Sequence, residues 1–501
     1  MQSRSKLVRN LAAVVSSNYA ARILSSITGL VIAKILTPFQ YGVLAKVDLI
    51  LSYCAYADAG VAYGLGRQVP FYRSRGEVDL LEQMRDTAFT TRLLTAGAVA
   101  VGLLVFAVTQ AGSIAPEIVA GLVFGAVAYF FRQISALYKA MLVADERFDL
   151  TSRTAVLGAA MGLITIPLIY FFKVYGSFVA TALIAVLIAI SFALLSGYRF
   201  SLRPARHAMT LIVRVGFPIL LIDLAWTLFK SIDQLTVARL MATEFLGYYS
   251  FATKLSGVLY IAASNVGSVM SPLYARRFAQ VNSVDQLRGS FLKPLYATAY
   301  AFPVLIGGGL FFGPPLVRLI YPQYVPALGA MQILLLGTFF WALSPQTILF
   351  FNAVSRKRIT AVGLVLTLMF AGALYALAIR YELGLEGIAV TRLIALGVLM
   401  TYLLYAANRT LGKPLGRSAL STLVLFAPFG YLLLGYAGLE LWSRTWTWLP
   451  EDYGLLSAAI NFAIYASVYL GLVAVLNHYT SLFADLLDIL RMVSARALSR
   501  G

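Results

Sequence analysis

"AKILTPFQYGVLA" (33–45) and "ARLMATEFLGYYS" (238–250) align without a gap at a shift of 205 residues. Ala33 falls opposite Ala238, Lys34 opposite Arg239 and Gly42 opposite Gly247. Each segment joins two long apolar runs, so the match relates two helix–turn–helix units. The two stretches therefore predict a chain built from two copies of one unit.

Composition places both copies in a membrane. Of the 501 residues, 60% are hydrophobic and only 12% are charged, whereas a soluble domain has about 25% charged residues. About 20 apolar residues span the hydrocarbon core as a helix, and runs this long are not barrel strands. About 14 such runs occur, at roughly 11–36, 41–66, 87–110, 117–139, 154–172, 177–197, 215–240, 246–272, 295–313, 327–350, 359–379, 387–407, 419–440 and 455–476. We expect an all-α polytopic membrane protein.

A second match extends the repeat. "YGSFVATALIA" (175–185) aligns to "EGIAVTRLIAL" (386–396), with Gly176 opposite Gly387. The two matches predict two six-helix lobes that enter the membrane in the same direction, an arrangement typical of transporters. The predicted divisions are an N-lobe at 1–210, a C-lobe at 211–410, an extra helix pair at 411–479 and a cytoplasmic amphipathic tail at 480–501.

The basic residues set the orientation. Of the 40 Lys and Arg residues, only Lys173, Arg318, Arg380 and Arg444 fall in loops on one side, while most lie in the tails and the loops on the other. Cytoplasmic segments carry this excess, so both termini are predicted to be cytoplasmic. The net charge of +19 is then explained by anionic lipid headgroups, without a nucleic-acid partner.

Charges inside the spans are costly and usually face a cavity or one another. Most of them cluster on the first, second, seventh and eighth spans, as Arg22, Lys34, Lys46, Asp48, Asp58, Asp223, Lys230, Asp233, Arg239 and Lys254. Arg92, Arg132 and Arg392 lie toward span ends, which favours side chains that reach the membrane surface or pair locally. Lys34, Lys46, Asp48 and Arg239 are also close enough to the outer surface for this interpretation.

The seventh span carries the densest group. Asp223, Trp226, Lys230 and Asp233 follow one another at offsets of three, four and three residues, which predicts a shared helix face. Lys230 and Asp233 could alternatively form only a pair within the helix. The three acids Asp58, Asp223 and Asp233 either carry H⁺ or Na⁺ or balance nearby cations.

Similar polar stripes occur on the first and eighth spans. Asn18 and Arg22 lie on the first, and Lys254 lies on the eighth. We expect the stripes bearing Arg22, Lys230 and Lys254 to converge on a hydrated cavity between the lobes.

The sequence does not indicate ATP hydrolysis, metal binding or enzymatic catalysis. No G-x-x-x-x-G-K-[ST] motif occurs, which argues against ATP hydrolysis. Cys54 is the single cysteine, and His207 and His478 lie outside the spans or at an edge, so no metal site is expected. We find no set of catalytic residues and expect neither an enzyme nor a cofactor beyond a coupling H⁺ or Na⁺.

Several motifs resemble one family in order and spacing. "SIDQLTVARLMATEFLGYYSFATKLSG" (231–257), "LTPFQYGVLA" (36–45), "YADAGVAYGLGRQV" (56–69) and "GLEGIAVTRLI" (384–394) are similar to segments of bacterial polysaccharide-unit flippases, the Wzx-type members of the multidrug/oligosaccharidyl-lipid/polysaccharide exporter superfamily. The resemblance extends over nearly the whole chain.

The resemblance implies a flippase of the bacterial inner membrane that moves undecaprenyl-diphosphate-linked oligosaccharides to the outer leaflet for O-antigen, capsule or exopolysaccharide assembly. It implies that Arg22, Lys46 and Lys254 attract the diphosphate, and that a polymerase and a chain-length regulator are partners. Lysine at position 254 meets phosphate as a point charge, without the two-pronged geometry of arginine. The oligomeric state stays open, a monomer included.

An ion-coupled multidrug exporter of the same superfamily is the alternative. Its cavity should be acidic and apolar, usually on twelve helices, whereas cations outnumber acids on the four charged spans here. The charge balance therefore favours a ligand that is itself anionic.

Overall fold

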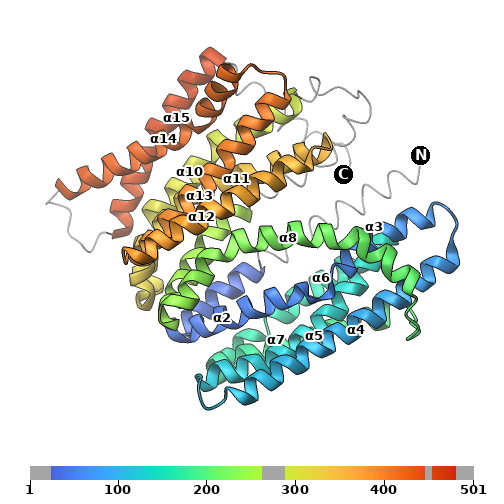
Figure 1. Ribbon diagram of the computed structural model, residues 1–501. Helices are drawn as coiled ribbons and strands as arrows, with labels where there is room; N and C mark the ends of the chain where they lie inside the picture. Colours follow the sequence, from blue (N-terminus) through green and yellow to red (C-terminus); the bar gives the residue numbers. More distant parts are fainter. Residues whose placement is uncertain (1–23, 262–287, 446–453, 481–501) are drawn as a thin grey trace, which may run out of the picture. The chain divides into compact units, whose positions relative to one another are not determined.

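The computed structural model describes residues 24–261, 288–445 and 454–480. Within these ranges all regular structure is helical, as the apolar runs predict (Figure 1). Each predicted span is mostly helical where its residues are described, with turns inside 41–66 and 154–172, and ten helices are long and apolar enough to cross a membrane. The number of spans, near 14, and the cytoplasmic position of both termini stay predictions.

Contacts divide the chain into two compact units, Met1–Ser250 and Phe251–Gly501. The first unit contains, in order, Leu24–Ile35, α2 Pro38–Cys54, η1 Ala55–Asp58, α3 Val61–Arg73, α4 Val78–Thr109, α5 Pro116–Ala144, α6 Phe148–Gly162, α7 Thr165–Ser196 and α8 Arg206–Leu240. Helix α5 packs against both α4 and α7, and α8 packs against α3. Because of this α3 contact, α8 groups with the first unit, although the predicted N-lobe ends at residue 210.

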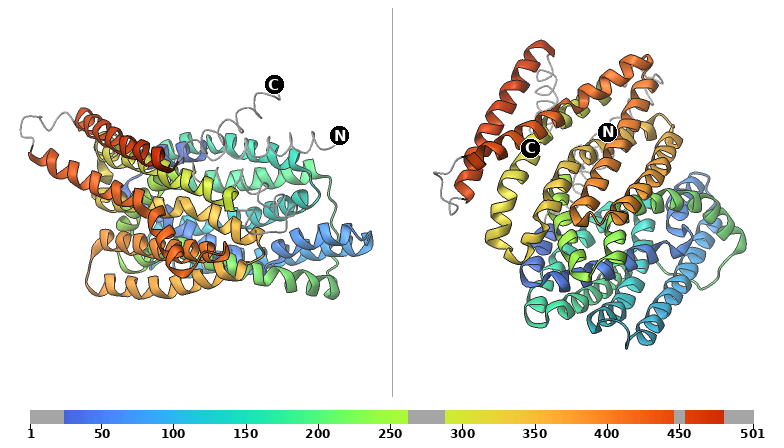
Figure 2. Two further views of the ribbon diagram at one scale, coloured as in Figure 1. Left: turned by 90° about the horizontal axis from the view of Figure 1, so that it is seen from above. Right: turned by 60° about the vertical axis from the view of Figure 1, so that its left-hand side comes forward.

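A helix over residues 243–261 begins in the first unit and continues into the second. The other elements of the second unit are α10 Arg288–Ile320, η3 Pro322–Ala327, α11 Leu328–Ala353, α12 Lys357–Arg380, α13 Gly384–Thr410, α14 Leu415–Thr445 and α15 Gly454–Thr480. Helix α13 packs against α11 and α12, while α14 and α15 both pack on α10 (Figure 2). Stacked rings fill this core, for example Phe291 on Phe350 at 4.3 Å. The predicted tail at 480–501 lies outside the described residues, apart from Thr480.

The predicted second span, 41–66, is not one continuous helix. Helix α2 ends at Cys54, and Ala59 (φ 51°) and Gly60 (φ 85°) adopt left-handed conformations before α3 begins. The Asp58 carboxylate accepts hydrogen bonds from the backbone N–H groups of Gly60 (3.1 Å) and Ala62 (3.3 Å). These bonds satisfy donors that the first turn of a helix leaves without partners, so the break is stabilised by its own sequence.

Helix α7 is also divided. Lys173 has φ 52° and ψ −132°, which is non-helical, and it lies in the turn expected between the runs 154–172 and 177–197. A Cβ on Gly176 would stand 2.0 Å from the Leu168 carbonyl oxygen. Only glycine allows the chain to fold back this closely after the turn.

The repeat motif itself forms a backbone contact. A Cβ on Gly42 would stand 1.9 Å from the Thr243 carbonyl oxygen, and one on Gly247 would stand 1.8 Å from the Pro38 carbonyl oxygen. Pro38 and Thr243 are equivalent residues of the repeat, as are Gly42 and Gly247. The contact therefore has local two-fold character, and glycine is required on both sides of it.

Candidate functional site

A polar cluster lies along α8, centred on Asp223, the middle residue of this 35-residue helix. Asp223 Oδ2 accepts hydrogen bonds from the hydroxyls of Tyr56 and Tyr63, both at 2.7 Å. Tyr56 lies in η1 and Tyr63 in α3, on either side of the break in the second span. The break therefore brings two tyrosines to one carboxylate.

The cluster continues along α8 toward its C-terminus. Tyr56 Oη lies 2.5 Å from Thr227 Oγ1, and Tyr53 Oη lies 2.7 Å from Ser231 Oγ. Ser231 in turn donates to the Thr227 backbone carbonyl at 2.7 Å. Hydroxyl groups of the α2–α3 segment thus follow one side of α8 over about two turns.

Lys230 and Trp226 flank these hydroxyls. Lys230 is exposed, and its ammonium nitrogen lies 5.9 Å from the centre of the Trp226 ring, within the range of a cation–π contact. Trp226 is half-buried and meets Phe229 edge to face at 6.1 Å. The lysine stem and the indole thus form an amphipathic surface beside the Asp223 cluster.

Asp233 is the most buried of the four residues of the predicted stripe. Its carboxylate is only 1% exposed and accepts a hydrogen bond from the Tyr249 hydroxyl at 2.8 Å. At 100° per residue, the ten residues from Asp223 to Asp233 end about 80° short of three full turns, so Asp233 lies at the edge of the stripe, about 20° from Trp226. Lys230 and Asp233 consequently have different surroundings, one exposed and one buried.

Asp58 is buried and forms an ion pair with Arg92 of α4, at 3.0 Å between Oδ2 and a guanidinium nitrogen. Arg92 is 5% exposed and also donates to Gln133 of α5. Of the two predicted interpretations, a side chain that reaches the membrane surface or a local pair, Arg92 shows the second, because an opposite charge holds it inside the unit. Tyr129 of α5 donates to the Cys54 carbonyl at 2.9 Å, which joins the same network to the end of α2.

The predicted phosphate-binding cations belong to different units of the chain. Lys46 is half-buried on α2 in the first unit, and Lys254 is exposed on the 243–261 helix, in the second unit. Asn18 and Arg22 lie outside the described residues. Their convergence on one cavity stays a prediction.

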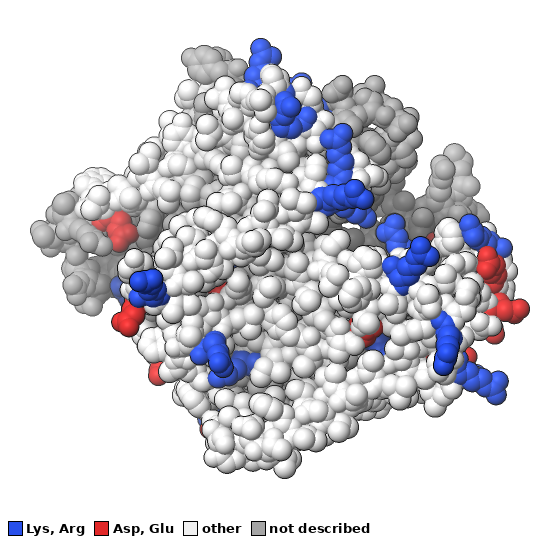
Figure 3. Space-filling model, in the orientation of Figure 1, with Lys and Arg blue, Asp and Glu red and all other residues white. Residues whose placement is uncertain are grey.

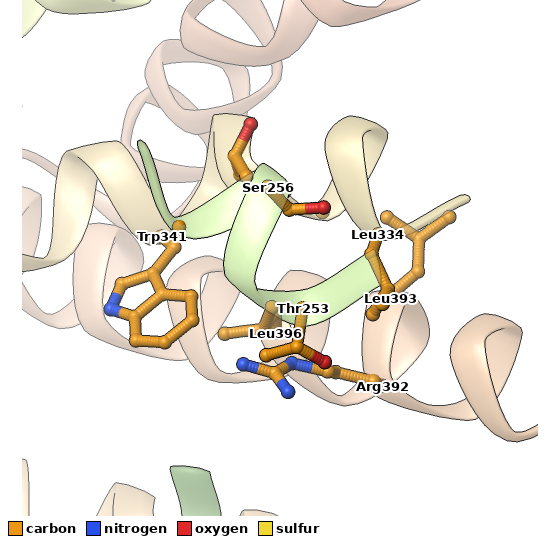
Figure 4. Close-up of a pocket in the computed structure, with 10 residues that line it drawn as sticks. Thr253, Ser256, Leu334, Trp341, Arg392, Leu393 and Leu396 are labelled. Atoms are coloured by element: carbon orange, nitrogen blue, oxygen red, sulfur yellow. The ribbon is translucent and has the colours of Figure 1, made fainter. Parts of the chain in front are cut away.

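The second unit contains a small pocket beside a further cation. Arg392 of α13 is 8% exposed, and its guanidinium lies 5.0 Å from the Trp341 ring centre. Figure 4 shows Arg392 pointing toward Trp341, with Thr253 and Ser256 along the pocket wall. The Ser256 hydroxyl donates to a helix carbonyl at 2.8 Å, so its lone pairs remain as acceptors in the pocket.

A third charged group lies between helix ends of the first unit. Asp145, which follows α5, accepts hydrogen bonds from Arg85 (2.8 Å), Tyr198 (2.5 Å) and Arg73. Burial raises the pKa of Asp145, but the Tyr198 and Arg73 hydrogen bonds and the Arg85 charge more than offset it, so the pKa lies below its usual range. Burial and Asp145 together raise the pKa of the Tyr198 hydroxyl. The carboxylate is therefore ionised at neutral pH.

Most of the surface shown in Figure 3 is uncharged, and the Lys and Arg side chains on it stand in separate groups. Such a surface suits contact with lipid. Within the described residues, no group of three or more His, Cys, Asp or Glu side chains could hold a metal ion.

Comparison with known families gives one match, to the family described as "Polysaccharide biosynthesis protein", over residues 31–324. The chain belongs to this family. The matched range includes the whole Asp223 cluster, the Asp58–Arg92 pair and the first copy of the repeat. A search of curated proteins finds no significant match.

Solved structures with the same fold are flippases and transporters. The lipid II flippase MurJ in an inward closed conformation aligns with a TM-score of 0.69 at 13% identity, covering 92% of this chain and 99% of that one. An inward-facing multidrug resistance MATE family transporter of the MOP superfamily gives 0.62 at 16% identity, over 81% and 98%. A MOP superfamily transporter from Pyrococcus furiosus gives 0.58 at 15% identity, over 80% and 95%.

The family and the fold confirm the predicted resemblance. With its ten membrane-length helices, this member of the polysaccharide biosynthesis protein family is a multi-pass membrane protein. Sequence reasoning missed the tyrosine partners of Asp223, although Tyr53, Tyr56 and Tyr63 stand at helical spacing in "YCAYADAGVAY" (53–63). That spacing was the available signal, whereas nothing in the sequence pairs Arg92 with Asp58.

Proposed function

We propose that this protein is a flippase for undecaprenyl-diphosphate-linked oligosaccharide repeat units. It moves them from the cytoplasmic to the outer leaflet of the bacterial inner membrane, for O-antigen, capsule or exopolysaccharide assembly. The observation that supports this most strongly is the polysaccharide biosynthesis family match over residues 31–324. The fold shared with MurJ supports the same class of substrate, since MurJ is a lipid II flippase.

The physical problem of such a substrate is its diphosphate. Two phosphate charges cannot enter hydrocarbon without compensation, and Lys or Arg side chains in a cavity of low dielectric provide it. We assign this role to Arg22, Lys46, Lys230 and Lys254, of which Lys230 and Lys254 are exposed and Lys46 is half-buried. Asn18 and Trp226 would contribute polar and aromatic contacts to the sugar. Alternating access between the two repeats would then carry the bound headgroup across.

Translocation needs an energy source, which we propose to be an H⁺ or Na⁺ gradient or the removal of product by polymer assembly. Asp233 is the strongest candidate for ion coupling, because it is buried and a tyrosine hydroxyl contacts its carboxylate. Asp58 serves charge balance instead, since Arg92 neutralises it. A polymerase and a chain-length regulator would act on the product.

Deletion of the gene followed by lipid analysis tests the proposal. We expect loss of surface polysaccharide and accumulation of undecaprenyl-diphosphate oligosaccharide on the cytoplasmic leaflet, measured by mass spectrometry and by protection from a membrane-impermeant reagent. Re-expression of the intact chain should restore both readouts. Sensitivity to cationic drugs with normal polysaccharide would instead favour the multidrug exporter, and would overturn the proposal.

A further inference from the structure

We propose that Asp223, Tyr56 and Tyr63 form a carbohydrate subsite that binds sugar hydroxyls of the transported headgroup. This inference rests on the proposed function and assigns Asp223 to substrate binding in place of ion coupling. All three residues belong to the first unit. The Tyr56 and Tyr63 hydroxyls both donate hydrogen bonds to Asp223 Oδ2.

The first step concerns where Asp223 lies. It is the middle residue of a membrane-length helix, it is only half-buried, and its Oδ1 accepts no hydrogen bond from the part of the chain that the structure describes. A carboxylate oxygen left open to lipid would be costly. Since no described residue donates to Oδ1, we infer that it faces water or a polar ligand on this side of α8.

The second step determines which hydroxyl group donates each hydrogen bond of the cluster. Ser231 donates to the Thr227 carbonyl, so the Tyr53 hydroxyl is the donor to Ser231. Tyr56 and Tyr63 each have one hydroxyl proton, and Asp223 Oδ2 accepts both, which makes Thr227 the donor to Tyr56. Every hydroxyl proton in the cluster is used internally.

The groups that remain are acceptors. Tyr63 is 37% exposed, and among the described residues no hydrogen bond is donated to Asp223 Oδ1 or to the Tyr63 hydroxyl oxygen. A ligand must bring donors to such a site. Sugar hydroxyls and N-acetyl N–H groups are donors, whereas a diphosphate has only acceptors and would be repelled by the carboxylate.

A metal ion fits less well. Hard cations require several oxygen ligands, commonly more than one of them a carboxylate, and no group of three or more acidic, His or Cys side chains occurs among the described residues. Here both tyrosine protons already point at the one carboxylate oxygen that is engaged. The cluster is organised to receive hydrogen-bond donors.

The position of the site along α8 agrees with the shape of the substrate. Lys230 is seven residues from Asp223, about 10 Å along the helix and almost on the same face. Trp226 lies between them and supplies the apolar surface on which sugar rings pack. A diphosphate bound at Lys230 would then place the first attached sugar near Trp226 and the next one near Asp223.

The test uses the purified full chain and two probes. One is undecaprenyl diphosphate without sugar, and the other is the lipid-linked oligosaccharide extracted from cells that lack the gene. We expect Asp223→Asn and Tyr63→Phe to weaken binding of the oligosaccharide lipid about tenfold and to leave the sugar-free lipid unchanged. Lys230→Gln should weaken both. Matched controls are Tyr170→Phe, at a 65% exposed tyrosine, and Asp79→Asn, at an exposed acid.

Equal weakening of both probes by Tyr63→Phe and Asp223→Asn, or no change with either, would overturn the carbohydrate subsite. Tyr63→Phe keeps the exposed ring and removes one hydroxyl, so it stays informative if Asp223→Asn does not fold. Failure of the proposed function gives a different pattern, because the unaltered protein would then bind neither lipid.

Discussion

Gly42 and Gly247, equivalent residues of the internal repeat, pack backbone against backbone in the first unit. A Cβ on either one would approach a carbonyl oxygen of the other segment to less than 2 Å, Thr243 in one case and Pro38 in the other. The two contacts are exchanged by the repeat, since Pro38 and Thr243 are themselves equivalent. A motif recognised by alignment is thus also the point where its two copies touch.

Alanine at position 42 or 247 should destabilise the protein. A methyl group has no space beside a carbonyl oxygen, so the two segments must separate, at a cost of about 2–3 kcal/mol. We expect a lower melting temperature for Gly42→Ala and for Gly247→Ala, measured on detergent-solubilised protein. The double variant should cost less than the sum, because one separation relieves both clashes.

Gly97→Ala is the matched control, because a Cβ there would meet nothing within 4 Å. It lies within α4, where alanine favours the helix by about 1 kcal/mol. Its melting temperature should therefore equal or exceed that of the unaltered protein. Additive losses in Gly42→Ala/Gly247→Ala would contradict a single shared contact.

The helices could be predicted because their apolar runs are long and uninterrupted. The break at Asp58–Gly60 could not, since the run 41–66 stays apolar across it and the decisive feature is the left-handed backbone at Ala59 and Gly60. "DAG" (58–60) offers the capping acid and the glycine, but these residues also occur inside membrane helices. Hydropathy alone does not distinguish the two cases.

Removal of one partner of the Asp58–Arg92 pair should be more harmful than removal of both charges. Arg92→Met leaves the Asp58 carboxylate buried without its counter-charge, at a cost of about 3–5 kcal/mol. Asp58→Asn keeps an acceptor for the backbone N–H groups of Gly60 and Ala62 but leaves Arg92 uncompensated. We expect Asp58→Asn/Arg92→Met to melt at a higher temperature than Arg92→Met, which a coupling purely through helix capping would not produce.

The candidate site shows a similar limit of sequence reasoning. The spacing of Asp223, Trp226 and Lys230 predicted one helix face, and these residues do lie within about 60° of one another. Asp233 lies about 20° from Trp226 in the same projection, but its carboxylate is buried and accepts a hydrogen bond from Tyr249, which the spacing does not indicate. The tyrosines around Asp223 come from another span, and their contact depends on the break between α2 and α3.

Acid should weaken the helix ends that meet at Asp145. The pKa of this carboxyl is lowered in the folded protein, so its stabilising effect is complete at neutral pH and is lost as the pH falls through the folded pKa. Asp145→Asn should cost about 1–2 kcal/mol at neutral pH, since Arg73 and Arg85 are partly exposed. The difference in melting temperature from the unaltered protein should shrink toward about pH 3. A difference that does not depend on pH would contradict the assignment.

The cations assigned to the diphosphate should be replaceable only by another positive charge. Lys254→Gln, Lys46→Gln and Arg22→Gln each remove a charge from the proposed cavity, and we expect surface polysaccharide to fall about tenfold or more with normal membrane insertion. Lys254→Arg should retain most activity, because arginine also binds phosphate. Lys139→Gln, at an exposed lysine of α5 outside the proposed site, controls for the loss of a positive charge. Normal polysaccharide in all three Gln variants would show that the diphosphate is neutralised elsewhere, whereas loss in Lys139→Gln as well would indicate a general requirement for basic residues.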